Sequence, residues 1–135
     1  MSRKKERVLV QVMGAWQILD GVITILLYGL GNTFNLPIIG TANIEYLNEL
    51  NNTYGGIFVL ICSFGIILIG LGMTNLMLAR RYIKDGKEHF KIGFFILGQG
   101  LFSYFIMDII SLVLGIIAGV LILAKNKPIR LSKED

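Results

Sequence analysis

Apolar residues are gathered into three long runs that polar segments separate. The first run covers residues 8–30, the second 54–79 and the third 92–124. A transmembrane helix needs roughly 20 mainly apolar residues to cross about 30 Å of hydrocarbon, and each of the first two runs meets that length. The third run would be about 50 Å long as one helix, which is too long for a single span, whereas two spans within it would be short.

The basic residues decide how often the third run crosses the membrane. All thirteen Lys and Arg residues lie within 3–7, 80–91 and 125–133. Cytoplasmic segments of membrane proteins are enriched in Lys and Arg, so we expect all three in the cytoplasm. An even number of crossings must then separate each pair, and the third run has to be a hairpin. The sequence thus predicts spans over 8–30, 54–79, 87–104 and 108–125, an outer loop over 31–53 and a cytoplasmic loop over 80–91.

The turn of this hairpin is expected between Ser103 and Asp108. The side chain of Asp108 can cap the outer end of the fourth helix, because a carboxylate accepts hydrogen bonds from the unpaired N–H groups of a first helical turn. That helix should run to Lys125, where Asn126 and Pro128 are expected to end it.

Composition agrees with a membrane protein. Hydrophobic residues make up 54% of the 135 residues and charged residues only 16%, against about a quarter charged in soluble domains. The mean hydropathy is +0.68. We expect an all-α, multi-pass membrane protein, a four-transmembrane-helix bundle that forms a single membrane domain over 1–135, in the cell membrane with both termini cytoplasmic. The net charge of +4 is explained by this orientation, so we expect no nucleic-acid partner.

Small residues recur at intervals that suit helix packing in lipid, where small side chains let helix backbones approach closely. Ser111, Gly115 and Gly119 are four residues apart on the fourth predicted helix. Spacings of seven residues relate Gly14 to Gly21, Gly65 to Gly72, Gly93 to Gly100, and Gly56 to Ser63 and Gly70. We expect these residues to pack inside a compact bundle, and a dedicated dimer interface is the alternative.

One acidic residue, Asp20, stands near the middle of a predicted span. An ionisable group in lipid is costly and is by default a functional hypothesis. Gln17 shares its helix face, and Asn75 and Gln99 are expected at about the depth of Gln17. These four residues form a candidate intramembrane polar site. Asp20 either exchanges a proton or binds a cationic substrate, or it is a neutral acid that joins two helices by a hydrogen bond.

Other reactive residues do not form a recognisable catalytic set. The single cysteine, Cys62, excludes an internal disulfide and CxxC chemistry. His89 lies among lysines, and nothing near it in the sequence completes a metal site. The sequence has no Gly-rich phosphate loop, Ser/His/Asp set or paired carboxylates. We therefore expect no catalytic, cofactor-binding or metal site, and a protein that is not an enzyme.

A basic loop precedes a glycine-punctuated apolar hairpin that ends in Leu114–Lys125. This pattern resembles the small four-span membrane proteins of low-GC Gram-positive bacteria that are filed as domains of unknown function. The resemblance covers Arg80 to Pro128. It implies a bacterial cell-membrane protein and supplies no catalytic residues.

Asp20 and the segment Gly119–Ile122 are also similar in position to residues of the small multidrug resistance transporters, which have four short helices and a membrane carboxylate in the first. Those transporters use Glu, have short loops, and many lack a strong charge bias. This chain has Asp, a long outer loop and a one-sided charge map, which disfavours the transporter reading.

Two functions remain open. The first is a non-enzymatic accessory, regulatory or immunity-type subunit of a larger membrane complex, which would have the lipid bilayer and another membrane protein or a second copy of itself as partners. The alternative is a small proton-coupled multidrug-type transporter that uses Asp20.

Overall fold

The computed structural model describes residues 2–30, 45, 49, 52–53 and 56–134. All regular elements of the described residues are helices, so the all-α class is confirmed. Most of the predicted outer loop over 31–53 lies outside the described residues.

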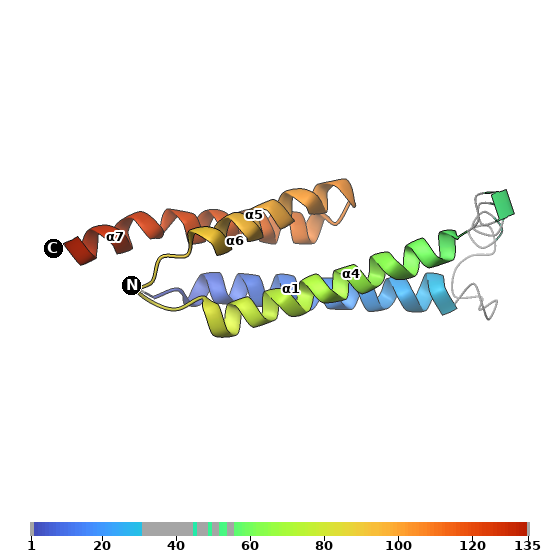
Figure 1. Cartoon of the computed structure of the whole chain (residues 1–135), viewed down its shortest axis with the longest axis horizontal. Coiled ribbons are helices and arrows are strands. Elements are labelled where there is room, and N and C mark those ends of the chain that lie inside the picture. Colours follow the sequence, from blue (N-terminus) through green and yellow to red (C-terminus); the bar gives the residue numbers. More distant parts are fainter. Residues whose placement is uncertain (1, 31–44, 46–48, 50–51, 54–55, 135) are drawn as a thin grey trace. The chain divides into compact units, whose positions relative to one another are not determined.

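The chain begins with helix α1 and returns through helix α4 (Figure 1). Helix α1 (Lys4–Thr24) continues as the π-helix η1 (Ile25–Leu30), and α4 (Ile57–Met77) continues as the π-helix η2 (Leu78–Tyr82). The C-terminal part consists of α5 (Phe90–Phe105), α6 (Ile109–Ala124) and α7 (Asn126–Glu134).

Three helices are long and apolar enough to cross a membrane. They are Lys4–Leu27, Val59–Tyr82 and Ile109–Ser132, each of 24 residues. Helix α5 has 16 residues, about 24 Å at 1.5 Å per residue. That is short of the roughly 30 Å of hydrocarbon in a bilayer, so α5 reaches less far than a full span.

The C-terminal part of the chain differs from the prediction in two respects. Helix α5 begins at Phe90 rather than at residue 87, because the chain turns at Gly86, whose φ is +67°. The fourth helix, α6, ends at Ala124 with Lys125 as its C-cap, as predicted. After Lys125, however, the chain enters a further helix, α7, which the sequence did not predict. Pro128 is tolerated there because it lies in the first turn, where a backbone N–H has no partner within the helix.

Contacts divide the chain into two compact units, Met1–Trp16 with Gly72–Asp135, and Gln17–Leu71. We call them the first and the second unit. The single domain over 1–135 stays a prediction. The core of the first unit contains Val10, Met13, Ala79, Ile83, Ile96, Ala118 and Ile122.

Glycines allow α1 and α4 to approach closely within each unit. In the first unit, a Cβ atom at Gly14 would lie 2.7 Å from the carbonyl oxygen of Gly72. In the second, a Cβ atom at Gly21 would lie 2.6 Å from the carbonyl oxygen of Gly65. Real Cβ atoms essentially never come that close to another atom, so larger residues at these two seven-residue spacings would separate the helices.

The α5–α6 hairpin is built in the same way. A Cβ atom at Gly115 would lie 2.6 Å from Cα of Gly100, and one at Gly119 would lie 2.8 Å from Cβ of Leu97. Ser111 is buried beside them. The small-residue stripe of the fourth predicted helix therefore belongs to a contact within the first unit. By contrast, Gly56 and Ser63 are exposed.

The turn between α5 and α6 lies where the sequence placed it. Met107 adopts a φ of +57°, and Asp108 follows as the N-cap of α6. The Oδ1 atom of Asp108 accepts the N–H of Ser111 at 3.0 Å, and its own N–H donates to the carbonyl of Ser103 at 3.0 Å. The predicted N-cap is confirmed.

Candidate functional site

Three basic segments meet at one end of the first unit. The backbone N–H of Arg3 donates to Oδ1 of Asp85 at 2.7 Å, and its Nη2 donates to Oδ1 of Asn126 at 2.7 Å. These bonds bring together the start of α1, the loop after η2 and the junction of α6 and α7. We call this the basic end. Because the three segments meet, the chain between any two of them leaves this end and returns to it, which agrees with an even number of membrane crossings. That this end faces the cytoplasm remains a prediction.

Arg3 and Asn126 form the centre of the basic end, and both side chains are fully buried. The Nη1 atom of Arg3 donates to the carbonyl of Ile122 at 3.2 Å. The Oδ1 atom of Asn126, which accepts from Arg3, also accepts the backbone N–H of His89 at 2.9 Å. One amide oxygen thus links the N-terminus to the start of α5. Burial lowers the pKa of Arg3, while the nearby Glu6 and Asp85 oppose that shift.

A second buried charge, Glu6, is paired across the same end. Its Oε1 atom lies 2.7 Å from Nζ of Lys125, and the Glu6 side chain has no exposed surface. Nζ also donates to the carbonyl of Ser2 at 3.0 Å. A buried carboxylate is stable only if it is paired, so Lys125 is needed to hold the first turn of α1 in place.

The rim of the basic end is more exposed. Arg7 and Asp85 form an ion pair at 3.4 Å. The N–H of Arg3, and then the charge of Arg7, hold the pKa of Asp85 below its usual value. The Nε2 atom of His89 lies 3.0 Å from the backbone N of Lys84. Burial lowers the pKa of His89, so the neutral imidazole, which can accept that N–H, is favoured in the fold.

The candidate intramembrane residues are divided between the units. Gln17 is buried and Asp20 is half-buried in the second unit, whereas Asn75 and Gln99 are buried in the first. Each of the four takes part in at least one interaction. A polar layer that joins all four stays a prediction.

Asp108 is a second carboxylate inside the apolar region, and the sequence reasoning assigned it only a capping role at the outer end. The indole Nε1 of Trp16 donates to its Oδ1 atom at 3.1 Å. Trp16 lies twelve residues after Lys4, about 18 Å along α1, and near the middle of the apolar helix Lys4–Leu27. Asp108 therefore caps α6, as predicted, and also contacts α1 near the middle of its apolar helix. The signal in the sequence was Trp16, since an indole N–H in lipid needs an acceptor.

The side chain of Asp108 is 9% exposed, and its Oδ2 atom is buried without a hydrogen-bond partner among the described residues. The same holds for Oγ of Ser111. The two fixed bonds, to Trp16 and to the first turn of α6, hold the carboxyl group in one orientation. It therefore ties α1 to the turn of the hairpin.

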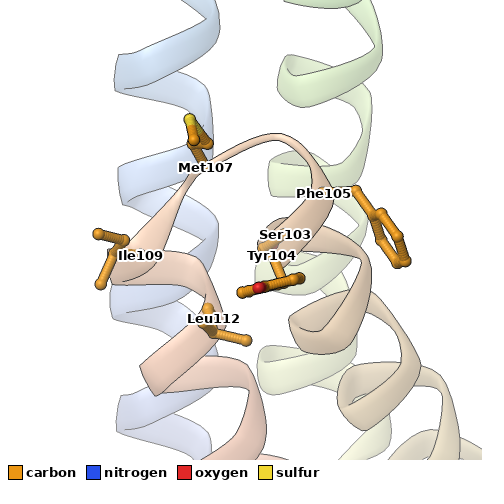
Figure 2. A pocket seen from close by; sticks show the side chains of 6 residues that line it. All are labelled: Ser103, Tyr104, Phe105, Met107, Ile109 and Leu112. Carbon is orange, nitrogen blue, oxygen red and sulfur yellow. The ribbon is translucent and has the colours of Figure 1, made fainter.

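Beside this turn lies a cavity of about 420 Å³. It is lined by Ser103, Tyr104, Phe105, Met107, Ile109 and Leu112. Figure 2 shows the side chains of Tyr104 and Leu112 below the arc of the turn, with Phe105 pointing away from α6. The hydroxyl of Ser103 donates to the carbonyl of Gln99 at 3.1 Å, which leaves a mostly apolar wall that suits hydrocarbon.

The described residues form no metal-binding cluster, and comparison with known proteins finds no match. Among the residues that the structure describes, no three His, Cys, Asp or Glu side chains gather closely enough to hold a metal ion. No protein-family model matches the sequence, and no curated protein or solved structure matches it at a significant level. Both family resemblances drawn from the sequence therefore remain predictions.

Proposed function

We propose that this chain is a small non-enzymatic integral membrane protein that acts as an accessory, regulatory or immunity-type subunit of a larger membrane complex. The setting would be a bacterial cell membrane with both termini in the cytoplasm. The observation that carries the proposal is that buried polar groups bond to partners on other segments of the chain. Glu6 pairs with Lys125, Arg3 with Asn126, and the Trp16 indole with a carboxylate. These groups hold helices together and do not converge on a cavity.

The cavities support the same conclusion. Two cavities of the first unit, of about 420 and 410 Å³, have mostly apolar walls. A site for a polar substrate needs a few convergent polar groups that fix its orientation. Walls of this kind favour lipid chains or apolar side chains of another protein.

One face of α6 is suited to a partner helix. Its exposed large hydrophobic residues are all β-branched: Ile109, Ile110, Val113, Ile117 and Val120. Such side chains have few rotamers in a helix, so they lose little conformational entropy when another helix packs against them. Helices in lipid associate mainly through such packing contacts and hydrogen bonds. This face therefore favours an interaction with a second membrane protein.

Site-specific crosslinking in native membranes tests the proposal. A photoreactive residue at Ile117 should crosslink to one partner protein, and the chain should copurify with it at near-stoichiometric levels. Leu101 of α5 is 51% exposed, close to the 44% of Ile117, and is the matched control that should not give this product. Recovery of the chain only as a lone species, with crosslinks only to lipid, would refute the proposal.

The transporter alternative is favoured by one observation. Gln17 is 1% exposed, and Asp20 follows it one turn later, half-buried on α1. If Asp20 carries protons, Asp20→Asn should abolish proton-coupled uptake by proteoliposomes, while Asp108→Asn, which keeps an oxygen acceptor for Trp16, should not. Unchanged uptake in Asp20→Asn, or no uptake by the wild type, would exclude this function.

A further inference from the structure

We propose that the groove between α1 and α6 at the basic end binds an anionic phospholipid. The groove has a volume of about 410 Å³ and is lined by Lys4, Lys5, Val8, Leu9 and Leu121. In this assignment the acyl chain lies against the three apolar residues and the headgroup phosphate contacts the two lysines. This lipid site does not depend on the proposed function and would be present whether or not the chain is a subunit of a complex.

The order of residues along α1 matches the polarity of a phospholipid. Lys4 and Lys5 open the helix, and Val8 and Leu9 follow one turn later on the same side. That turn covers about 6 Å along the helix axis, so the charged and apolar parts of the groove are adjacent but separate. Val8 is 47% exposed, and Leu121 of α6 provides the opposite wall. A hydrocarbon chain can therefore enter the groove from the bilayer.

The two lysines are available for a phosphate. The two ion pairs found among the described residues, Arg7 with Asp85 and Lys125 with Glu6, use other cations. Lys4 and Lys5 are exposed. The nearest acid in the sequence, Glu6, is fully buried and 2.7 Å from Lys125, so it does not neutralise them. The charge at the mouth of the groove is positive, which complements an anionic headgroup.

A second groove in the first unit shows what distinguishes this site. It lies between α4 and α5, has a volume of about 270 Å³, and is lined by Thr74, Leu78, Lys91, Ile92 and Phe95. It also combines apolar walls with a basic residue, but it is smaller and has a single lysine. Basic pockets between transmembrane helices bind anionic lipid headgroups, and more than one lysine is needed to prefer them strongly over zwitterionic ones. The groove between α1 and α6 meets that condition.

The test is lipid retention by the purified full-length protein. In a neutral detergent with equal amounts of phosphatidylglycerol and phosphatidylcholine, native mass spectrometry should show preferential retention of phosphatidylglycerol. Each lysine near an anionic lipid is worth about fivefold in affinity. Lys4→Gln with Lys5→Gln should therefore weaken phosphatidylglycerol binding by about 30-fold.

Two further variants locate the site. Lys127→Gln with Arg130→Gln removes two exposed basic residues of the same end that do not line the groove, and it should leave the preference largely intact. Val8→Phe should fill the groove and reduce retention of both lipids. Val8 is partly exposed, so the fold should survive, and the fluorescence of Trp16 checks this.

Three results would overturn the inference. The first is equal retention of the two lipids by the wild type. The second is an equal loss in the Lys127/Arg130 variant, which would show a diffuse effect of positive charge. The third is displacement of the lipid by excess glycerol phosphate, which would show that a soluble phosphate compound is bound without its chain.

Discussion

A close backbone contact between α5 and α6 gives the sharpest prediction about stability. Gly100 of α5 faces Gly115 of α6, and a Cβ atom at Gly100 would lie 2.9 Å from the carbonyl carbon of Gly115 and 2.9 Å from the backbone N of Ile116. Both neighbours are backbone atoms, so neither can move aside by a change of rotamer. Gly100→Ala should therefore push the two helices apart.

The size of this effect can be worked out with an internal control. Ordinary contacts of Cβ atoms begin at 3.4 Å, so α6 must move by about half an ångström. Overpacking of this kind costs about 1–3 kcal/mol. Alanine also favours a helix over glycine by about 1 kcal/mol. Gly98, two residues earlier on α5, is exposed, and a Cβ atom there would meet nothing within 4 Å.

Comparing Gly100→Ala with Gly98→Ala cancels the helix-propensity gain, because both changes are made in the interior of the same helix. We expect Gly98→Ala to be neutral or to stabilise by up to about 1 kcal/mol. We expect Gly100→Ala to be about 1–3 kcal/mol less stable than Gly98→Ala. Unfolding in mixed micelles with rising sodium dodecyl sulfate, followed by circular dichroism and by the fluorescence of the single tryptophan, measures this difference.

Equal unfolding midpoints for the two alanine variants would refute the reasoning, because they would mean that the two glycines do not differ in their surroundings. A third variant, Gly115→Ala, adds a second check. Its Cβ atom would lie 2.6 Å from Cα of Gly100, so its loss of stability should be at least as large as that of Gly100→Ala.

Three more predictions concern the basic end and use the same unfolding assay. Asn126→Leu should lower the free energy of unfolding by about 2–3 kcal/mol, because it removes the acceptor of a buried guanidinium, whereas Asn126→Asp should retain most of the stability; equal losses would contradict this. Lys125→Met should cost about 3–5 kcal/mol by leaving a buried carboxylate unpaired, and adding Glu6→Leu should restore much of the loss; additive losses in the double variant would count against the pairing. Because burial lowers the pKa of His89 from 6.5, the unfolded chain binds more protons below pH 6.5. The stability that the neutral His89 side chain contributes is complete above pH 6.5 and declines as the pH falls toward the lowered pKa. His89→Gln should flatten that part of the pH profile. An unchanged profile would show that His89 has the same pKa in the folded and unfolded chain.

The hairpin illustrates what could be predicted from local chemistry. The position of its turn followed from the charge map and from Asp108, whose carboxylate caps α6 through a bond three residues away. A cap of this kind depends on neighbouring residues only. The end of the fourth helix near Lys125 was also predicted correctly. The helix that follows was missed, because Pro128 was interpreted as a helix terminator although it occupies the first turn of α7.

The candidate polar site shows where local reasoning stopped. Asp20 was chosen because it lies in the middle of an apolar run. Asp108 was assigned only its role as the cap of α6, and only the structure shows its bond to Trp16, near the middle of the apolar helix Lys4–Leu27. That bond joins residues 92 positions apart. The depth of a residue in a short hairpin depends on which residue of another helix it meets, and periodicity does not contain this information.

The sequence by itself determined the helical class, the apolar segments and the grouping of the basic segments, because these depend on the cost of exposing backbone and charge to lipid. The tertiary structure alone decided that Arg3 and Glu6 are buried among basic neighbours. It also decided which glycine faces which, as in the pair of Gly100 and Gly115. The physical reason is that, for a charged residue near a helix end, exposure to water and pairing with a buried partner have similar free energies. The choice is made only when distant segments supply the partner, as Asn126 and Lys125 do here.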